Sequence, residues 1–217
     1  MPRTINIGGS HPTEVVESES LSCVRSPKIT YHLQLPSSVF RRNCLSNVQA
    51  EAIIYACQAH EQRLPAWERI GFLIGDGVGL GKGRTIAGVI RENWILGEKK
   101  CVWISASKDL EQDARRDLND VEASHIPVMS ITNISYNQDV KEVFQKGVLF
   151  STYSSLISKK FGYDHVAKYE SRFQQIMNWL GVDFNGLLVF DESHKARKFN
   201  PDRLTEVNSI GENQNGN

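Results

Sequence analysis

The sequence has few cysteines and no spacing typical of a zinc site. Its 217 residues contain four cysteines, with no C-x-x-C pair and no Cys/His group at zinc-ligand spacing. Reduced thiols in an intracellular protein are therefore the expected state. Charge of one sign is also lacking, because 25 Lys and Arg balance 25 Asp and Glu. This balance removes the global basic signature of nucleic-acid binding but leaves room for a local basic groove.

Long hydrophobic runs are missing as well. No apolar run approaches the roughly 20 residues of a membrane span, and residues 1–10 lack the apolar region of a signal peptide. Cytosol or nucleus is therefore the expected location. A hydrophobic content of 40% and a charged content of 23% suit a soluble globular protein of one domain or slightly more.

The two ends of the chain differ from its middle. Residues 1–30 are polar and rich in serine, which predicts an extended arm. Residues 31–198 carry the periodic apolar patterns of a folded domain. Residues 199–217 lose that pattern, and we expect them to form a disordered tail.

Strands and helices are predicted to alternate along residues 31–198. Apolar residues at helical spacing predict a first helix over 45–60, with Ser46 as its N-cap. Strands are expected at 72–74, 101–105, 126–131, 147–152 and 186–190, and helices at 82–96, 108–119 and 165–180. Continuously apolar strands separated by helices indicate an open, mainly parallel α/β sheet. Ligands bind such sheets at the carboxyl ends of the strands.

A glycine-rich loop follows the first expected strand. Residues 71–85 read Gly-Phe-Leu-Ile-Gly-Asp-Gly-Val-Gly-Leu-Gly-Lys-Gly-Arg-Thr. Glycines such as Gly77, Gly79 and Gly81 let backbone N–H groups turn toward phosphate oxygens, and Lys82 is placed to reach the β- and γ-phosphates. The order of strand, loop and helix is that of a P-loop NTPase, which holds a nucleoside triphosphate.

The match to the strict pattern G-x-x-x-x-G-K-[ST] is incomplete. Asp76 occupies the first glycine position, and Gly83 replaces the hydroxyl residue that normally binds Mg²⁺. Thr85, two residues later, is a candidate substitute ligand. Judged alone, the loop fits a phosphate cradle and a merely glycine-rich turn equally well. The dinucleotide pattern G-x-G-x-x-G fits in no register.

A second motif follows the last expected strand, where Asp191, Glu192 and His194 come after four apolar residues. Asp191 is placed to hold Mg²⁺ through water, and Glu192 to act as the general base on the attacking water. A solvated acidic turn is the alternative. The glycine loop upstream, in the same strand–helix series, favours the nucleotide interpretation.

Three further residues have two interpretations each. His194 either couples the nucleotide to other parts of the protein or is a solvated loop residue. Gln49 either hydrogen-bonds adenine or is an ordinary surface glutamine. Thr152, at the end of a strand, either contacts nucleic-acid phosphate or ends the strand without further function. The Lys159–Lys160 pair and the basic residues after His194 are interpreted as solvated surface.

These motifs occur in the order typical of the first RecA-like domain of superfamily 2 helicases. The sequence Gly75-Asp-Gly-Val-Gly-Leu-Gly-Lys-Gly-Arg-Thr-Ile-Ala-Gly88 is more specific, because it resembles the Strawberry notch family of nuclear transcription and chromatin regulators. Further matching segments are Leu45-Ser-x-x-Gln49-x-Glu-Ala52, Trp103-Ile-Ser105, Asp113-Ala-Arg-Arg-Asp-Leu118 and Val189-Phe-Asp-Glu-x-His-Lys-Ala196. The resemblance covers about residues 11–198.

The resemblance implies a helicase-like ATPase that binds ATP and Mg²⁺. Lys82 would contact the phosphates together with the loop residues Gly83 and Arg84, while Asp191 would hold Mg²⁺, Glu192 act as base and Gln49 contact adenine. Glycine after the lysine is usual in this family. A nuclear location, chromatin or transcription-regulatory protein partners and control of transcription are also implied, with nucleic acid as a further expected partner.

No Ser-Ala-Thr motif and no second RecA-like domain follow the acidic motif. In related folds the Ser-Ala-Thr strand lies between the P-loop strand and the Walker-B strand, so its absence predicts a gap in the sheet. We therefore expect an ATP-binding fragment with little hydrolysis of its own. The alternative is a non-catalytic interaction module in transcription with a vestigial nucleotide site. A complete small P-loop kinase is disfavoured, because no acceptor-site or lid segment follows Asp191.

Overall fold

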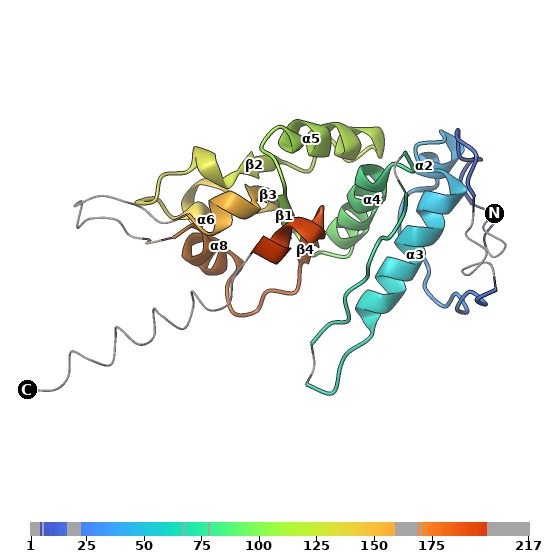
Figure 1. The fold of residues 1–217 in the computed structure, drawn as a ribbon, viewed down its shortest axis with the longest axis horizontal. Coiled ribbons are helices and arrows are strands. Elements are labelled where there is room, and N and C mark those ends of the chain that lie inside the picture. The colour runs from blue at the N-terminus through green and yellow to red at the C-terminus, as the bar shows by residue number, and fades with distance from the viewer. Residues whose placement is uncertain are drawn as a thin grey trace, which may run out of the picture.

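The computed structural model describes residues 5, 7–16, 23–66, 68–77, 79–158, 169 and 171–198, without the side chains of 197 and 198. The predicted tail over 199–217 and the Lys159–Lys160 pair lie outside these residues. Figure 1 shows a central sheet between two groups of helices, with the N-terminal region against α3.

The sheet has four parallel strands in the order β2-β3-β1-β4. Their bounds are Val128–Ser130 for β2, Gly147–Thr152 for β3, Lys100–Ser105 for β1 and Leu187–Phe190 for β4. The register places Trp103 of β1 between Phe150 and Val189. The predicted parallel α/β sheet is therefore confirmed, and all residues of β3 are buried, as its apolar sequence indicates.

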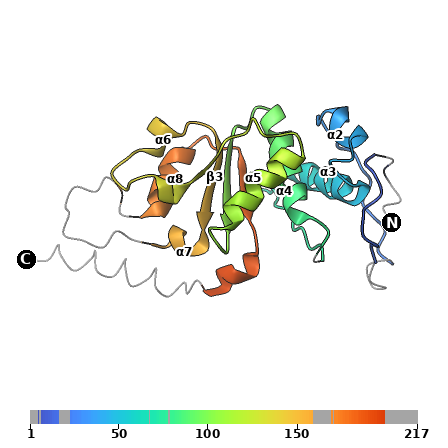
Figure 2. The same cartoon turned by 90° about the horizontal axis from the view of Figure 1, so that it is seen from above.

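Helices cover both faces of the sheet (Figure 2). One face holds α4 (Lys82–Ile95) and α5 (Leu110–Asp120), with α3 (Asn47–Glu61) packed on the far side of α4. The other face holds α6 (Val140–Val143) and α8 (Arg172–Leu180). The remaining short helices are α2 (Ser37–Arg41), α7 (Tyr153–Leu156) and the 3₁₀ turns η1 (Ile131–Asn133) and η2 (Ser193–Lys198).

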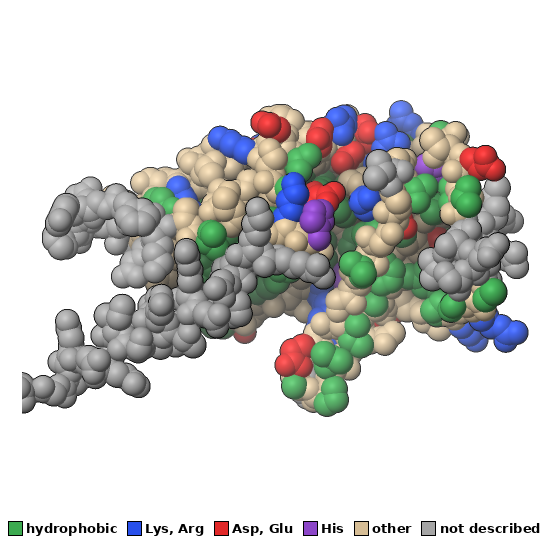
Figure 3. Space-filling model, in the orientation of Figure 1, with side chains coloured by type: hydrophobic (Ala, Val, Ile, Leu, Met, Phe, Trp, Pro, Cys, Tyr) green, Lys and Arg blue, Asp and Glu red, His purple; other side chains and the backbone are tan. Residues whose placement is uncertain are grey.

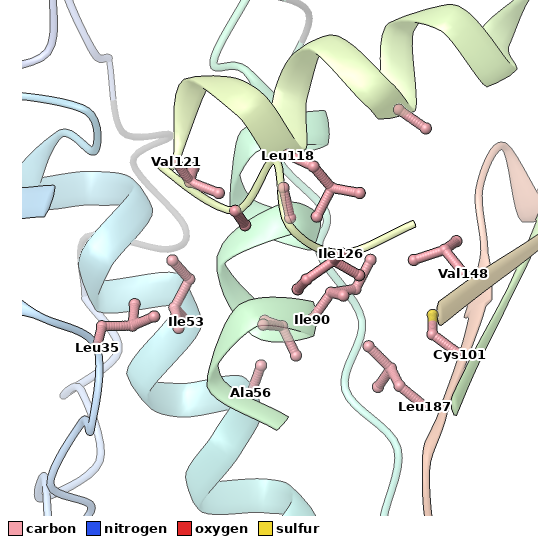
Figure 4. Close-up of a cluster of buried hydrophobic side chains, with 14 of the residues drawn as sticks. Leu35, Ile53, Ala56, Ile90, Cys101, Leu118, Val121, Ile126, Val148 and Leu187 are labelled. Carbon is pink, nitrogen blue, oxygen red and sulfur yellow. The ribbon is translucent and has the colours of Figure 1, made fainter. Parts of the chain in front are cut away.

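Alternate residues of β1 enter two separate hydrophobic clusters. Cys101 and Trp103 join the cluster shared with α3, α4 and α5, whereas Val102 and Ile104 join the cluster shared with α6 and α8. Figure 4 shows side chains from α3, α4, α5 and the strands meeting in the first cluster. This division follows from the two-residue period of a strand.

The region before α3 is fastened to the helices by side chains. Ser46 caps α3, because its hydroxyl accepts from Gln49 N and the Gln49 side chain accepts from Ser46 N, which completes a capping box and confirms the predicted N-cap. Farther along, Glu92 of α4 is fully buried and accepts hydrogen bonds from Tyr31 Oη at 2.8 Å and Gln34 N at 2.7 Å. These bonds fix the entering chain against α3 and α4.

The expected strand at 72–74 does not form, which corrects the sequence-based prediction. Residues 71–77 have no regular structure and, among the described residues, no hydrogen bond joins them to β4. They lie across a cavity of about 1090 Å³ from β4. A strand needs a neighbour to satisfy its backbone groups, and none adjoins this segment in the described chain.

The other predicted elements are present within a few residues of their expected bounds. Of the helix expected over 165–180, α8 covers 172–180, and residues 165–168 and 170 lie outside the description. Among the described residues, no helix is long and apolar enough to cross a membrane.

Candidate nucleotide-binding site

The glycine loop turns sharply into α4. Gly79 has φ +92° and Gly81, the N-cap of α4, has φ +71°. Both values lie in the left-handed region that glycine enters without steric cost. Lys82 Nζ donates to the carbonyl oxygens of Asp76 at 3.0 Å and Gly77 at 3.3 Å. The lysine charge is therefore held at the mouth of the loop, where the sequence predicts phosphates.

Gly83 is explained by a contact that sequence reasoning missed. A Cβ atom at this position would collide with Asp117 Oδ2 of α5. Glycine, in place of the usual Ser or Thr, thus lets a carboxylate approach the first turn of α4. Partial burial raises the pKa of Asp117, with Arg116 as an opposing influence. The segment 113–118 carries a family resemblance, but its sequence does not reveal this contact.

Gln49 supports the loop directly. Its Nε2 donates to the carbonyl oxygens of Leu80 at 3.0 Å and Gly81 at 3.3 Å, while its Oε1 accepts from Ser46 N at 3.0 Å. The side chain is buried. Both ends of the amide are thus engaged within the protein, and Gln49 joins the start of α3 to the loop.

Arg84 and Thr85 point to different surroundings. Arg84 Nε donates to Asp120 Oδ2 at 3.1 Å, and its guanidinium forms an ion pair with the same carboxylate. Thr85 is fully buried, and its Oγ1 has no hydrogen-bond partner among the described residues. It lines neither of the two cavities that adjoin the loop. The structure therefore does not place Thr85 at the cavity that Lys82 and the acidic motif share.

Asp191 is positioned by neighbouring elements. Ser105 Oγ, at the end of β1, donates to Asp191 Oδ2 at 2.8 Å, and Asp191 N donates to Ile104 O at 2.8 Å. Tyr153 Oη, from α7, donates to the backbone carbonyl of Asp191 at 3.0 Å. Burial, reinforced by the charges of Asp191 and Glu192, raises the pKa of Tyr153. Ser105 and Tyr153 both lie in segments with family resemblance, but the sequence did not predict that either side chain contacts Asp191.

Glu192 adopts an unusual backbone conformation. Its φ is +50°, which costs energy for a residue with a Cβ. Its Oε2 lies 3.3 Å from His194 Nδ1, and the two side chains are 45% and 65% exposed. The pair is therefore open to solvent at the carboxyl end of β4, where a water molecule and a ligand can reach it.

The larger cavity brings the two sequence motifs together. Asp76 and Lys82 line it from the loop side, and Asp191, Glu192 and His194 line it from the side of β4. Figure 3 shows acidic, basic and histidine side chains close together over η2, beside hydrophobic surface. Motifs far apart in the sequence thus face the same space at the carboxyl end of the sheet.

Thr152 is placed differently from the other candidates. It is buried at the end of β3, and its Oγ1 accepts from Ser155 N at 3.1 Å as the N-cap of α7. It does not line the larger cavity. Its observed contacts are those of a helix cap.

The carboxylates suit Mg²⁺ held together with phosphates. Among the described residues, no cluster of three or more His, Cys, Asp or Glu side chains could hold a metal. Mg²⁺ in nucleotide sites is bound by only one or two carboxylates, with phosphates and water completing its shell. Asp191, opposite Lys82 across the cavity, fits that arrangement.

Comparison with known proteins identifies the family. A family model described as "P-loop containing NTP hydrolase pore-1" matches residues 10–215. Protein strawberry notch of Drosophila melanogaster is 47% identical over 203 residues, and protein strawberry notch homolog 2 of Mus musculus is 49% identical over 197 residues, covering 92% and 91% of this chain. The chain belongs to the Strawberry notch family. Protein FORGETTER 1 of Arabidopsis thaliana is 45% identical over 213 residues, 97% of the chain.

The chain spans 12% to 16% of the length of these three relatives. No solved structure matches it. The family and the fold together support a helicase-related ATP-binding domain of the P-loop type.

Proposed function

We propose that the chain is the ATP-binding part of a helicase-related ATPase that acts in chromatin-linked regulation of transcription in the nucleus. The observation that carries the ATP site is the shared cavity of Lys82 and the Asp191–Glu192 pair. Family membership supports the wider role, with chromatin or transcription-regulatory proteins and nucleic acid as partners. Fluorescence microscopy of a tagged full-length protein tests the nuclear location.

Each residue of the cavity has a distinct role in this proposal. The loop N–H groups and the Lys82 ammonium would bind the phosphates, and Asp191, oriented by Ser105, would hold Mg²⁺ through water. When bound, Mg²⁺ neutralises phosphate charge. Glu192, exposed at the same cavity, would accept a proton from the attacking water. His194 would contact both Glu192 and the neighbouring parts of a longer protein.

Hydrolysis is expected to need more than these residues. An arginine that stabilises transition-state charge contributes on the order of 10³–10⁵ in rate in phosphoryl-transfer enzymes. Among the described arginines, only Arg63 and Arg69 line the larger cavity. Both donate hydrogen bonds to Asn185 Oδ1, so they are already engaged. We therefore expect binding without substantial turnover by the 217-residue chain.

Calorimetric titration of the 217-residue chain with Mg-ATP tests the proposal. Saturable binding is expected, and Lys82→Ala should abolish it. Lys146→Ala is the matched control, because Lys146 is an exposed lysine directly before β3, at the opposite end of the sheet from the loop. Loss of binding in both variants, or retention in both, would contradict the assigned role of Lys82.

The alternative is a non-catalytic interaction module with a vestigial nucleotide site. Two observations favour it: Gly83 supplies no hydroxyl, and Thr85 is buried away from the cavity. The same titration distinguishes the two functions. A folded chain that binds no Mg-ATP at millimolar concentration supports the interaction module.

A further inference from the structure

A basic cavity lies at the amino ends of the strands, opposite the glycine loop. It has a volume of about 1000 Å³, at the upper end of the range of about 300–1,000 Å³ that is usual for small-molecule sites. The lysines that line it are Lys99, Lys100, Lys141 and Lys146, and the acidic residues are Glu98 and Asp183. The whole chain carries no net charge, so this excess of positive charge is a local feature.

Two of these lysines are held at the ends of helices. Lys99 Nζ donates to Trp94 O, in the last turn of α4, at 2.5 Å. Lys100 Nζ donates to Trp179 O at 2.5 Å and to Leu180 O at 3.3 Å, at the end of α8. The carbonyl groups at a helix C-terminus attract cations. These bonds therefore fix two ammonium groups in the wall of the basic cavity.

The other two lysines have no such anchors. Lys141 and Lys146 are exposed, and no described residue accepts a hydrogen bond from either ammonium group or forms an ion pair with it. Lys141 belongs to α6, which packs against α8 (Figure 2). Burial and the charge of Lys141 lower the pKa of Lys100, so the two ammonium groups are close enough to repel each other. An anionic partner would relieve this repulsion.

Apolar side chains on α8 continue the wall of the basic cavity. Ile176 and Trp179 are buried against the sheet, whereas Phe173 and Met177 lie one turn apart on the outer face and are half exposed. Met177 lines the cavity, and so does the fully exposed Val182 in the loop after α8. Phe173, Met177 and Val182 form what we call the apolar strip. A helix that is apolar on both sides usually packs on both, and methionine adapts to varied partners.

We propose that the basic cavity and the apolar strip form a docking site for an acidic peptide segment of a partner protein, whose carboxylates contact Lys141 and Lys146 and whose apolar side chains cover Met177 and Val182. Charge complementarity favours the carboxylates. A nucleic acid suits the site less well, because its phosphates are bound by basic and polar groups and would leave the apolar strip uncovered. The site lies at the opposite end of the sheet from Lys82, so the inference does not depend on ATP binding.

The test measures the fluorescence anisotropy of labelled synthetic peptides titrated with the 217-residue chain. The first peptide repeats Asp-Leu-Glu-Phe and carries both charge and apolar side chains. The second repeats Asn-Leu-Gln-Phe and lacks the charge, and the third repeats Asp-Ser-Glu-Ser and lacks the apolar side chains. The first peptide should bind at least about tenfold more tightly than the other two. Its affinity should fall as NaCl is added, because salt screens exposed charges.

A charge reversal tests the lysines. Lys141→Glu should weaken binding of the first peptide on the order of fivefold to tenfold, since an attraction becomes a repulsion, and should leave the uncharged peptide unaffected. The variant should fold, because an acidic residue is favourable in the first turn of α6. Lys108→Glu is the matched control, since Lys108 is an exposed lysine just before α5 that does not line the basic cavity.

A second pair of variants tests the apolar strip. Val182→Ser should weaken binding of the first peptide severalfold and leave the Asp-Ser-Glu-Ser peptide unaffected. Val182 is fully exposed, so its substitution removes no packing from the fold. Val24→Ser is the control, because Val24 is also exposed and does not line the basic cavity. Circular dichroism melting checks that all variants are folded.

Several results would overturn the proposal. Equal binding of the three peptides, or parent-like binding by Lys141→Glu, would show that the site does not select an acidic apolar segment. An equal loss in Lys141→Glu and Lys108→Glu would indicate attraction to the overall charge only. Tighter binding of a labelled oligothymidylate, lost in Lys141→Glu, would identify a nucleic-acid surface instead. A concentration-dependent dimer in size-exclusion chromatography, lost in the same variant, would identify a second copy of the chain as the occupant.

Discussion

Replacing Gly83 with alanine moves the loop toward the usual P-loop pattern, yet we expect it to destabilise the chain. Gly83 is the second residue of α4, where alanine alone would gain up to about 1 kcal/mol through helix propensity. The added methyl group would collide with Asp117 Oδ2. The atom in the way is the end of the half-buried Asp117 side chain, so the methyl group must displace that carboxylate, and overpacking of this kind costs about 1–3 kcal/mol when the neighbour cannot move freely.

The net effect follows from these two terms. Gly83→Ala should lower the free energy of unfolding by up to about 2 kcal/mol in the parent chain. In an Asp117→Ala background the collision is absent, so the same substitution should raise it by about 0.5–1 kcal/mol. The sign of the effect therefore depends on residue 117, with a coupling free energy of about 2 kcal/mol between the two positions.

A double-mutant cycle followed by urea or thermal unfolding measures this coupling. For a chain of this length, 1 kcal/mol corresponds to about 2–4 °C in Tm, which circular dichroism resolves. A coupling below about 0.5 kcal/mol would show that the two residues act independently. The account of Gly83 given above would then be wrong, and its contact with Asp117 could not explain the glycine.

Two further predictions concern buried polar groups. Glu92→Gln should lower the free energy of unfolding by about 1–3 kcal/mol in urea titrations, because it replaces a buried carboxylate that accepts hydrogen bonds with a neutral amide. Tyr31→Phe, which removes one donor to that carboxylate, should cost less. Burial, with a smaller effect of the Arg69 charge, lowers the pKa of His60 to about 4, so the folded chain holds this ring neutral. The contribution of His60 to the free energy of unfolding should therefore be fully present above about pH 6.5 and be lost as the pH falls toward 4. His60→Gln should flatten this pH dependence. If the variant and the parent chain show the same pH dependence of stability, the assignment to His60 is wrong.

Most of the sheet was predictable because each of its strands contains a short apolar run that is visible in the sequence itself. Residues 147–152 have an apolar centre over 148–150 and form β3 within the predicted bounds. Residues 72–74 are equally apolar, yet they form no strand. The difference lies in the neighbour: β3 pairs with β1 and β2, whereas no strand of the described chain adjoins 72–74. Composition cannot reveal whether a partner is present.

The candidate site was predictable in its motifs but not in their supports. Lys82 and Asp191 stand in short patterns that the chemistry of phosphate and Mg²⁺ requires. Asp117, Ser105 and Tyr153 come from other elements, and only the folded chain brings them to these motifs. Such contacts join residues far apart in sequence, so a single sequence gives no pattern for them.

The opening between residues 71–77 and β4 determines how far apart the two halves of the ATP site stand. Its two sides are tied at one end, where Arg69 Nη2 donates to Asn185 O at 2.7 Å. Toward the ligand end, Leu188 and Phe190 of β4 remain 47% and 54% exposed, and Leu73 is 81% exposed. An element inserted there would act as a spacer, because its width would fix the separation of Lys82 from Asp191. A change in the width of such an element would alter the distance between the phosphate-binding Lys82 and the Mg²⁺-binding Asp191 without a substitution at either residue.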